Sequence, residues 1–298
     1  MANRRFVLAN GRGLGLSGLG DAAAKRLVVL CHPTPGSGMF DPNPTITSTW
    51  GVHLIGLDRP GYGGSDPVGD SEPVTIERRA DDIAEFLERT ERVSSEVTGT
   101  DFGRVGVVGW GIGAEVAMSL AARHPRRIDR LIVVSAVAPV ASEQSSPSSA
   151  LECLEVSRGD TMESLIARVS ELMPFGLDAL GVSLDDPALG RLGELGRLGR
   201  MLREAEVQGA IGVATDLLSR HDPGWVADLD RITAETVLVY GEDDPVARAY
   251  DSAWFAKRIP HARRATVRGS GRLVISDVWQ QVLQHVAPRH GGVPPEFR

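Results

Sequence analysis

Short apolar runs alternate along the chain with longer segments that mix apolar and charged residues. Several runs are too short for helices and indicate buried strands, at residues 25–32, 51–58, 104–110 and 129–137. The amphipathic pattern between them predicts helices at residues 76–89 and 114–124, the second of which ends before Pro125. This alternation predicts an α/β fold with a mostly parallel sheet that helices cover on both faces.

Both ends of the chain extend this pattern. The glycine-rich residues 5–21 predict a short antiparallel strand pair that turns at Asn10 and Gly11. Near the other end, the apolar runs predict strands at residues 236–244 and 264–271, and the periodic segments predict helices at 249–258 and 276–286.

The middle of the chain has a different pattern. Residues 138–233 contain no convincing strand; serine and proline cluster at 142–149, and helical patterns follow at 162–172, 187–206 and 210–219. We therefore expect a helical cap at residues 138–233, inserted into an α/β core formed by residues 1–137 and 234–298. Such a cap would lie above the carboxyl ends of the strands, where open α/β sheets bind ligands.

Composition narrows the class of protein. A net charge of -7 argues against a nucleic-acid partner, because phosphate contacts need clustered Lys and Arg. The two cysteines, Cys31 and Cys153, form no disulfide framework, which favours a reducing cytoplasm. The first residues lack the apolar core of a signal peptide, and no apolar run is long enough to span a membrane. We expect a cytoplasmic protein with no metal and no organic cofactor. The sequence leaves two alternatives for its assembly, a monomer and a homo-oligomer.

One turn carries most of the chemical information. The sequence GWGIG at residues 109–113 follows a predicted buried strand and precedes a predicted helix. In the G-x-S-x-G turn of many enzymes, the central serine is a nucleophile on a sharp turn. Here the central residue is Gly111, which has no nucleophilic side chain and adopts strained backbone angles freely.

Further motifs place this turn in a family. Sequence blocks occur in a fixed order at residues 31–38 (CHPTPGSG), 57–66 (LDRPGYGGSD), 109–113, 240–246 (YGEDDPV) and 269–273 (GSGRL). With these blocks the chain resembles the α/β-hydrolase fold superfamily, and in particular its bacterial capped hydrolases. The resemblance implies a serine, an acid and a histidine, and the matching positions here are Gly111, Asp244 and Arg272. Only the acid remains, since arginine stays protonated and cannot act as a general base.

The residue at the histidine position has two interpretations. Arg272 could form a charge-assisted, bidentate pair with Asp244 and so repair the site structurally. Alternatively, Arg272 binds an anionic group of a ligand in the old pocket.

The resemblance also suggests ligand-binding residues. It places His32 in the loop that shapes the oxyanion hole, either as a structural residue or as a new catalytic base. It assigns the amides of Thr34 and Ile112 to that hole, since Pro33 has no N–H. Trp110 either lines an open pocket or fills it.

Two other residues near these motifs are ambiguous. Glu115 either favours the helix N-terminus at the surface or projects into the pocket. Cys31 is expected to be a small buried hydrophobe. The remaining histidines lie outside the matched motifs and are expected to be non-catalytic.

These observations leave several functions open. The first is a protein with a degenerate triad that binds a small apolar molecule, or a partner, between cap and core. The second is a non-hydrolytic enzyme, such as a lyase, isomerase or cyclase, that uses His32, Asp244 and Arg272. The third is a hydrolase with an atypical mechanism.

Overall fold

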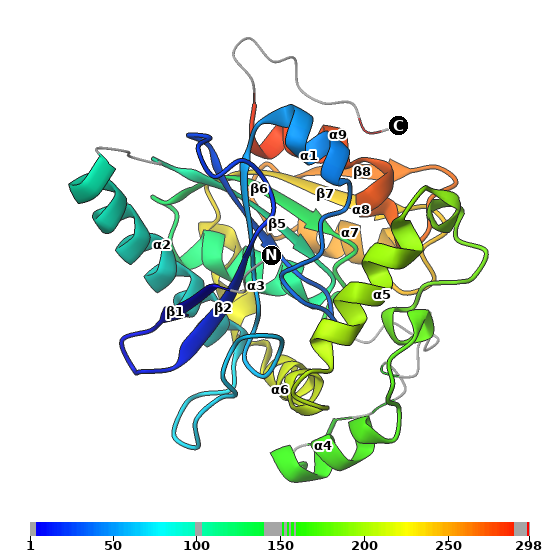
Figure 1. Ribbon diagram of the computed structural model, residues 1–298. Coiled ribbons are helices and arrows are strands. Elements are labelled where there is room, and N and C mark those ends of the chain that lie inside the picture. Colours follow the sequence, from blue (N-terminus) through cyan, green and yellow to red (C-terminus); the bar gives the residue numbers. More distant parts are fainter. Residues whose placement is uncertain are drawn as a thin grey trace.

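A single twisted sheet forms the centre of the molecule (Figure 1). The computed structural model describes residues 4–98, 103–139, 151, 154, 156–157, 159–288 and 297. Within these residues the sheet has eight strands in the order β1-β2-β4-β3-β5-β6-β7-β8. The strands are β1 (Arg4–Val7), β2 (Gly13–Gly18), β3 (Leu27–Cys31), β4 (His53–Leu57), β5 (Val105–Trp110), β6 (Ile128–Val134), β7 (Glu235–Gly241) and β8 (Arg263–Val267).

Strands β3 to β8 pair in parallel with one another, whereas β2 is antiparallel to both β1 and β4. The central strands are buried on both faces, as their continuous apolar sequences require. The predictions of a mostly parallel sheet and of an antiparallel pair at the N-terminus are therefore confirmed.

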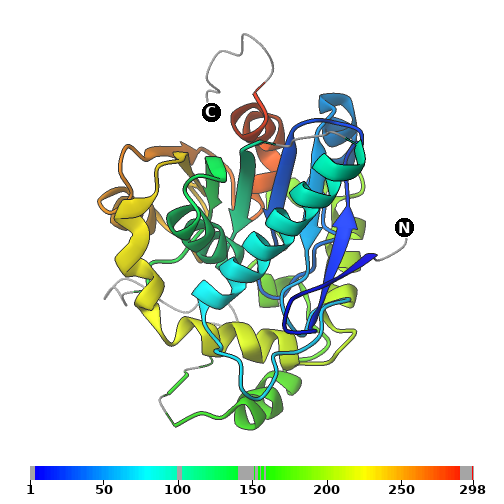
Figure 2. The same cartoon turned by 90° about the vertical axis from the view of Figure 1, so that its left-hand side faces the viewer.

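Helices cover both faces of this sheet (Figures 1 and 2). On one face α3 (Ile112–Arg123) packs on β5 and β6, with α2 (Ile76–Thr98) beside it; on the other face α9 (Trp279–Val286) packs on the same strands, beside α1 (Pro44–Trp50). Successive residues of β5 alternate between the two hydrophobic clusters, with Val107 in one and Val108 in the other. The helices of the core are α1 (Pro44–Trp50), α2 (Ile76–Thr98), α3 (Ile112–Arg123), α7 (Ala249–Ala256), α8 (Val274–Asp277) and α9 (Trp279–Val286).

Residues 138–233, which we call the β6–β7 segment, connect β6 to β7. In its described part there is no strand. Its elements are α4 (Met162–Ser170), η1 (Leu177–Leu180), η2 (Pro187–Gly190), α5 (Glu194–Ala205), α6 (Ile211–Arg220) and η3 (Pro223–Arg231). The predicted serine- and proline-rich stretch at 142–149 and Cys153 lie outside the described residues.

Several predicted elements differ in detail from the structure. The helix expected at 187–206 is broken after η2, because Arg191 is extended and Gly193 adopts a left-handed conformation. The final helix is divided into α8 and α9 at Val278. Helix α1 was not predicted, although Asn43 caps it and Pro44 begins it. No described helix has the length and apolar character that crossing a bilayer requires.

Candidate functional site

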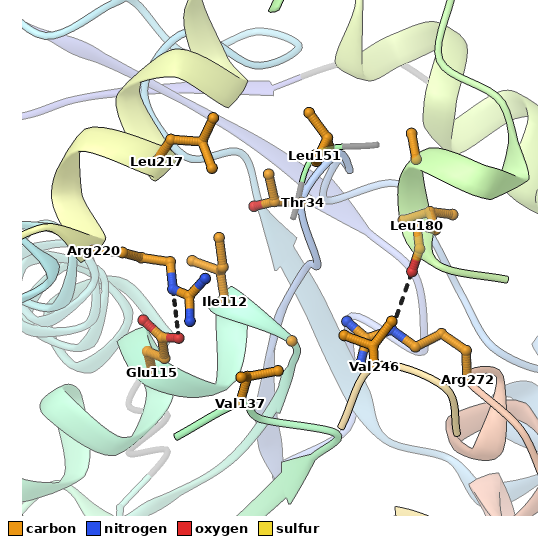
Figure 3. A pocket seen from close by; sticks show the side chains of 12 residues that line it. Thr34, Ile112, Glu115, Val137, Leu151, Leu180, Leu217, Arg220, Val246 and Arg272 are labelled. Carbon is orange, nitrogen blue, oxygen red and sulfur yellow. Dashed lines mark hydrogen bonds and ion pairs between the residues drawn. The ribbon is translucent and has the colours of Figure 1, made fainter. Parts of the chain in front are cut away.

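A pocket lies where the carboxyl ends of the parallel strands meet the β6–β7 segment (Figure 3). Its volume is about 70 Å³, and it mixes apolar side chains with a few charged ones. The lining residues are Thr34, Gly111, Ile112, Glu115, Val137, Leu151, Ala179, Leu180, Leu217, Arg220, Val246 and Arg272. Those from the core follow the ends of β3, β5, β6, β7 and β8, which is the usual place for ligands in open α/β sheets.

Gly111 forms the sharp turn between β5 and α3. Its φ and ψ angles are 60° and -124°, a conformation that strains other residues by roughly 1–3 kcal/mol. Its N–H donates to the carbonyl of Val134 at 3.0 Å, which fixes the turn to the end of β6. A Cβ atom at position 111 would lie 3.2 Å from Nη2 of Arg272 and 3.7 Å from Cβ of Pro33. The guanidinium therefore borders the space that a nucleophilic side chain would occupy.

Arg272 is held mainly by carbonyl groups. Its Nε donates to the carbonyl of Leu180 at 3.1 Å, and its Nη1 donates to the carbonyl of Ser135 at 3.1 Å. Nη1 also reaches Oδ2 of Asp244, but at 3.5 Å. Arg272 and Asp244 therefore form the expected ion pair, but not in bidentate geometry, because only Nη1 contacts the carboxylate and Nε donates to a carbonyl instead.

Asp244 is buried and caps the backbone that follows β7. Its Oδ1 accepts from the N–H groups of Val246 at 2.9 Å and Ala247 at 3.1 Å. Its side chain is fully buried, and it does not line the pocket. The structure thus brings Gly111, Asp244 and Arg272 together, but in an arrangement that contains neither a nucleophile nor a base beside position 111.

His32 and Trp110 lie outside the pocket lining, unlike Thr34 and Ile112. His32 accepts from the N–H of Arg59 at its Nε2 (3.1 Å), so its Nδ1 carries the proton and donates to the carbonyl of Pro33 at 2.8 Å. Burial and the nearby Arg59 lower the pKa of His32 to about 3, so the ring is neutral. His32 therefore shapes its loop and has no free nitrogen for proton transfer.

Trp110 packs in the hydrophobic cluster on the face of the sheet that α9 covers. It packs against Phe40, with 5.6 Å between ring centroids, and it is 1% exposed. It therefore neither lines the pocket nor fills it.

A buried ion pair that the sequence did not reveal joins the core to the β6–β7 segment. Arg59 follows β4, and its Nε and Nη2 donate to the two carboxylate oxygens of Asp216 in α6 at 2.9 and 2.6 Å. The hydroxyls of Thr34 and Tyr62 also donate to Asp216. Burial opposes its ionisation, yet the charge and hydrogen bonds of Arg59 keep the pKa of Asp216 below its ordinary value.

Arg59 also holds the loop that precedes the pocket. It donates to the carbonyls of His32 and Pro33 and to the Thr34 hydroxyl. The hydroxyl of Thr34 thus accepts from Arg59 and donates to Asp216.

A second charged pair lies on the opposite side of the pocket from Arg272 (Figure 3). Glu115, in the first turn of α3, accepts from Nε of Arg220 in α6 at 2.9 Å. Glu115 is 3% exposed, so the surface interpretation is wrong and the pocket interpretation holds. Burial raises the pKa of Glu115 to about 7, although Arg220 opposes the shift.

Other candidate groups have structural surroundings. Cys31 is buried at the end of β3, and burial raises the pKa of its thiol to about 12, so it is not a nucleophile at neutral pH. His124 contacts Asp81, and His285 contacts the carbonyl of Glu235, both away from the pocket. In the part of the chain that the structure describes, no group of His, Cys, Asp and Glu is arranged to hold a metal ion.

Comparison with known proteins identifies this architecture. A family model for the alpha/beta hydrolase fold matches residues 26–160. A solved hydrolase from Pseudomonas aeruginosa superposes with a TM-score of 0.69 at 20% identity, covering 96% of this chain and 98% of that chain. An esterase from Exiguobacterium antarcticum gives a TM-score of 0.68 at 18% identity, covering 94% and 96%. The chain therefore has the α/β-hydrolase fold.

Curated relatives are more similar in sequence, but they match a smaller part of the chain. The chain is similar to the pimeloyl-[acyl-carrier protein] methyl ester esterase of Aromatoleum aromaticum, with 29% identity over 172 residues, 53% of this chain and 63% of that protein. The protein of the same name from Neisseria meningitidis serogroup A is 25% identical over 221 residues, 74% of this chain and 62% of that protein. The matched part thus spans less than two thirds of either relative.

Proposed function

We propose that this protein binds a small molecule in the pocket between its core and the β6–β7 segment, without Ser-His-Asp hydrolysis. One observation carries the proposal. Gly111 stands at the position of the turn where a nucleophile would be, and Nη2 of Arg272 borders the space that the nucleophilic side chain would occupy. The chemistry of the triad needs an attacking oxygen and a nitrogen base, and the matched positions supply neither.

The β6–β7 segment acts in this proposal as the cap, with residues 138–233 closing the site over the core. Its attachment supports that role, because Arg59–Asp216 and Glu115–Arg220 tie α6 to the core. Apolar side chains of the lining, Val137 among them, would contact the hydrocarbon part of a ligand.

The relatives are named as esterases, and that activity is proposed to be lost here. A fold supports many functions, so the fold leaves the activity to be decided by the site. The site has kept a shaped pocket and the start of α3, and it has lost the two residue types that perform acyl transfer.

A second candidate is a non-hydrolytic enzyme that transfers a proton in this pocket. The raised pKa of Glu115, about 7, favours it, because such a carboxyl group exchanges protons near neutral pH. His32 is a poor alternative, since both of its ring nitrogens are engaged. The candidates differ in one respect: only the enzyme needs Glu115 to gain and lose a proton.

Hydrolysis of p-nitrophenyl acetate tests the leading proposal. Wild-type protein should match the buffer blank, because it has no nucleophile in the pocket. The Gly111→Ser/Arg272→His variant should exceed wild type by about 100-fold or more, since the acid and the helix N-terminus are already in place. The matched control is Gly111→Ala/Arg272→His, which restores the base without the nucleophile and should stay silent. Wild-type turnover that disappears in Asp244→Asn would contradict the proposal.

A further inference from the structure

Arg272 is a largely buried residue of the pocket lining that has one nitrogen without an acceptor from the protein. Arg272 is 7% exposed, and Nε and Nη1 are bonded to the carbonyls of Leu180 and Ser135. Its Nη2 has no hydrogen-bond partner among the described residues, and it lies 3.2 Å from the point where a Cβ atom at position 111 would be. A guanidinium nitrogen that faces a pocket and has no acceptor from the protein attracts an acceptor oxygen of a ligand, because hydrogen bonds to a charged group are stronger than those between neutral groups.

The start of α3 provides a second donor at the same place. The helix begins at Ile112, and Gly111 precedes it without any side chain to cap its free amides. The first amides of a helix carry partial positive charge and point out along its axis, which attracts an anion. Gly111 lies next to both Nη2 of Arg272 and the first residue of α3. An anion beside Gly111 would therefore contact the guanidinium and the first amides of the helix.

We infer that the pocket binds the carboxylate of a short aliphatic acid, with its oxygens between Nη2 of Arg272 and the N-terminus of α3. This inference rests on the proposed function, because a nucleophilic side chain at position 111 would occupy the same space. The carboxylate takes the place of that missing side chain.

The remaining lining limits the size and polarity of the acid. The volume of about 70 Å³ is less than half of an engineered cavity that holds benzene, roughly 150 Å³, so an acid of about two to four carbons fits. Val137, Leu180 and Val246 lie near the guanidinium and would contact the hydrocarbon chain (Figure 3).

The other arginine of the pocket is a poorer anion site. Arg220 is paired with Glu115 at 2.9 Å, and 30% of its side chain is exposed, so water can solvate its remaining nitrogens. The side chain of Arg272 is 8% exposed, and its partner Asp244 lies at 3.5 Å. The carboxylate is therefore placed on Arg272.

Titration calorimetry with sodium butyrate tests this inference, with butyramide as the uncharged analogue and sodium chloride at equal ionic strength. Wild-type protein should bind butyrate saturably, with a dissociation constant of about 10 mM or lower, and at least about tenfold more tightly than butyramide. Gly111→Ser, which fills the space and retains Arg272, should weaken butyrate binding about tenfold or more. Arg272→Gln should weaken it similarly, and Arg231→Gln, which alters an exposed ion pair, should leave it unchanged.

Each other result would overturn the inference. Absence of saturable butyrate binding by folded wild type excludes the acid site, and equal competition by chloride excludes recognition of a carboxylate. If butyrate binding survives Gly111→Ser but disappears in Arg220→Gln, the carboxylate binds Arg220 and not Arg272. If Arg272→Gln fails to fold, Gly111→Ser still decides. Failure of the proposed function is a separate result, because it appears as wild-type turnover of p-nitrophenyl acetate.

Discussion

Two buried arginine–aspartate pairs lie next to residues of this pocket, and their geometries differ. Arg59 grips Asp216 with two hydrogen bonds of 2.9 and 2.6 Å, whereas Arg272 meets Asp244 through one contact of 3.5 Å. In the first pair the guanidinium is fully used, because its other bonds go to the loop before the pocket. In the second pair one nitrogen remains without a described partner.

The difference in hydrogen bonding suggests different roles: Arg59–Asp216 is a structural pair, whereas we propose that Arg272 of the other pair binds a ligand. A buried ion pair that is fully hydrogen-bonded fixes the position of the elements it joins, and here it joins α6 to the core. A buried arginine that is held by two carbonyls, with one nitrogen left over, presents a positioned charge. Arg59 and Asp216 thus join α6 to the core beside the pocket, whereas the role that we propose for Arg272 is to bind a ligand.

The largest expected effect is on stability. Asp216→Ala leaves Arg59 charged and buried without its carboxylate, so we expect it to lower the free energy of unfolding by about 3–5 kcal/mol. Asp244→Ala is the comparison variant and should cost less, about 2–3 kcal/mol, because it removes one 3.5 Å contact to Arg272 and the acceptor of the Val246 and Ala247 N–H groups. Urea denaturation of the two variants measures the difference. Equal losses would mean that the two pairs contribute alike.

A smaller effect concerns pH. The pKa of Glu115 is raised from 4.5 to about 7 by burial, so the folded protein keeps a proton that the unfolded chain releases between those values. Its contribution to stability is complete below about pH 4.5 and is lost as the pH rises to about 7. Between about pH 5 and pH 8, the stability of wild type relative to Glu115→Gln should therefore fall by about 1–3 kcal/mol.

Thermal unfolding of both proteins across this pH range measures the effect. Glu88→Gln, at an exposed position of α2, is the control and should follow wild type at every pH. A constant difference between wild type and Glu115→Gln would show that Glu115 titrates normally.

The sequence predicted the parts of this molecule that have a local pattern. The apolar runs fixed the strands of the sheet, and GWGIG fixed the turn at Gly111, because a strand, a tight turn and a helix each need particular neighbouring residues. The order of the motif blocks also placed Asp244 and Arg272 at one end of the sheet, and the structure brings both beside the turn.

The parts that were not predicted depend on contacts between distant residues. Arg59 and Asp216 are 157 positions apart, and an aspartate within a helix gives no indication of its partner. The carbonyl of Leu180, which holds Nε of Arg272, is a backbone group and so has no sequence signal. The expected bidentate pair failed for this reason. The burial of Glu115 likewise depends on the position of α6, which local periodicity does not determine.

The most direct test of the central claim is covalent labelling of the nucleophile position. Folded protein is incubated with a fluorophosphonate, which transfers its phosphonyl group to an activated serine, and the intact mass is then measured. The account predicts no change in mass for wild type and one phosphonyl group added at position 111 of Gly111→Ser/Arg272→His. A wild-type adduct on a pocket residue, abolished in Asp244→Asn, would contradict it and show that the wild-type pocket contains an activated nucleophile.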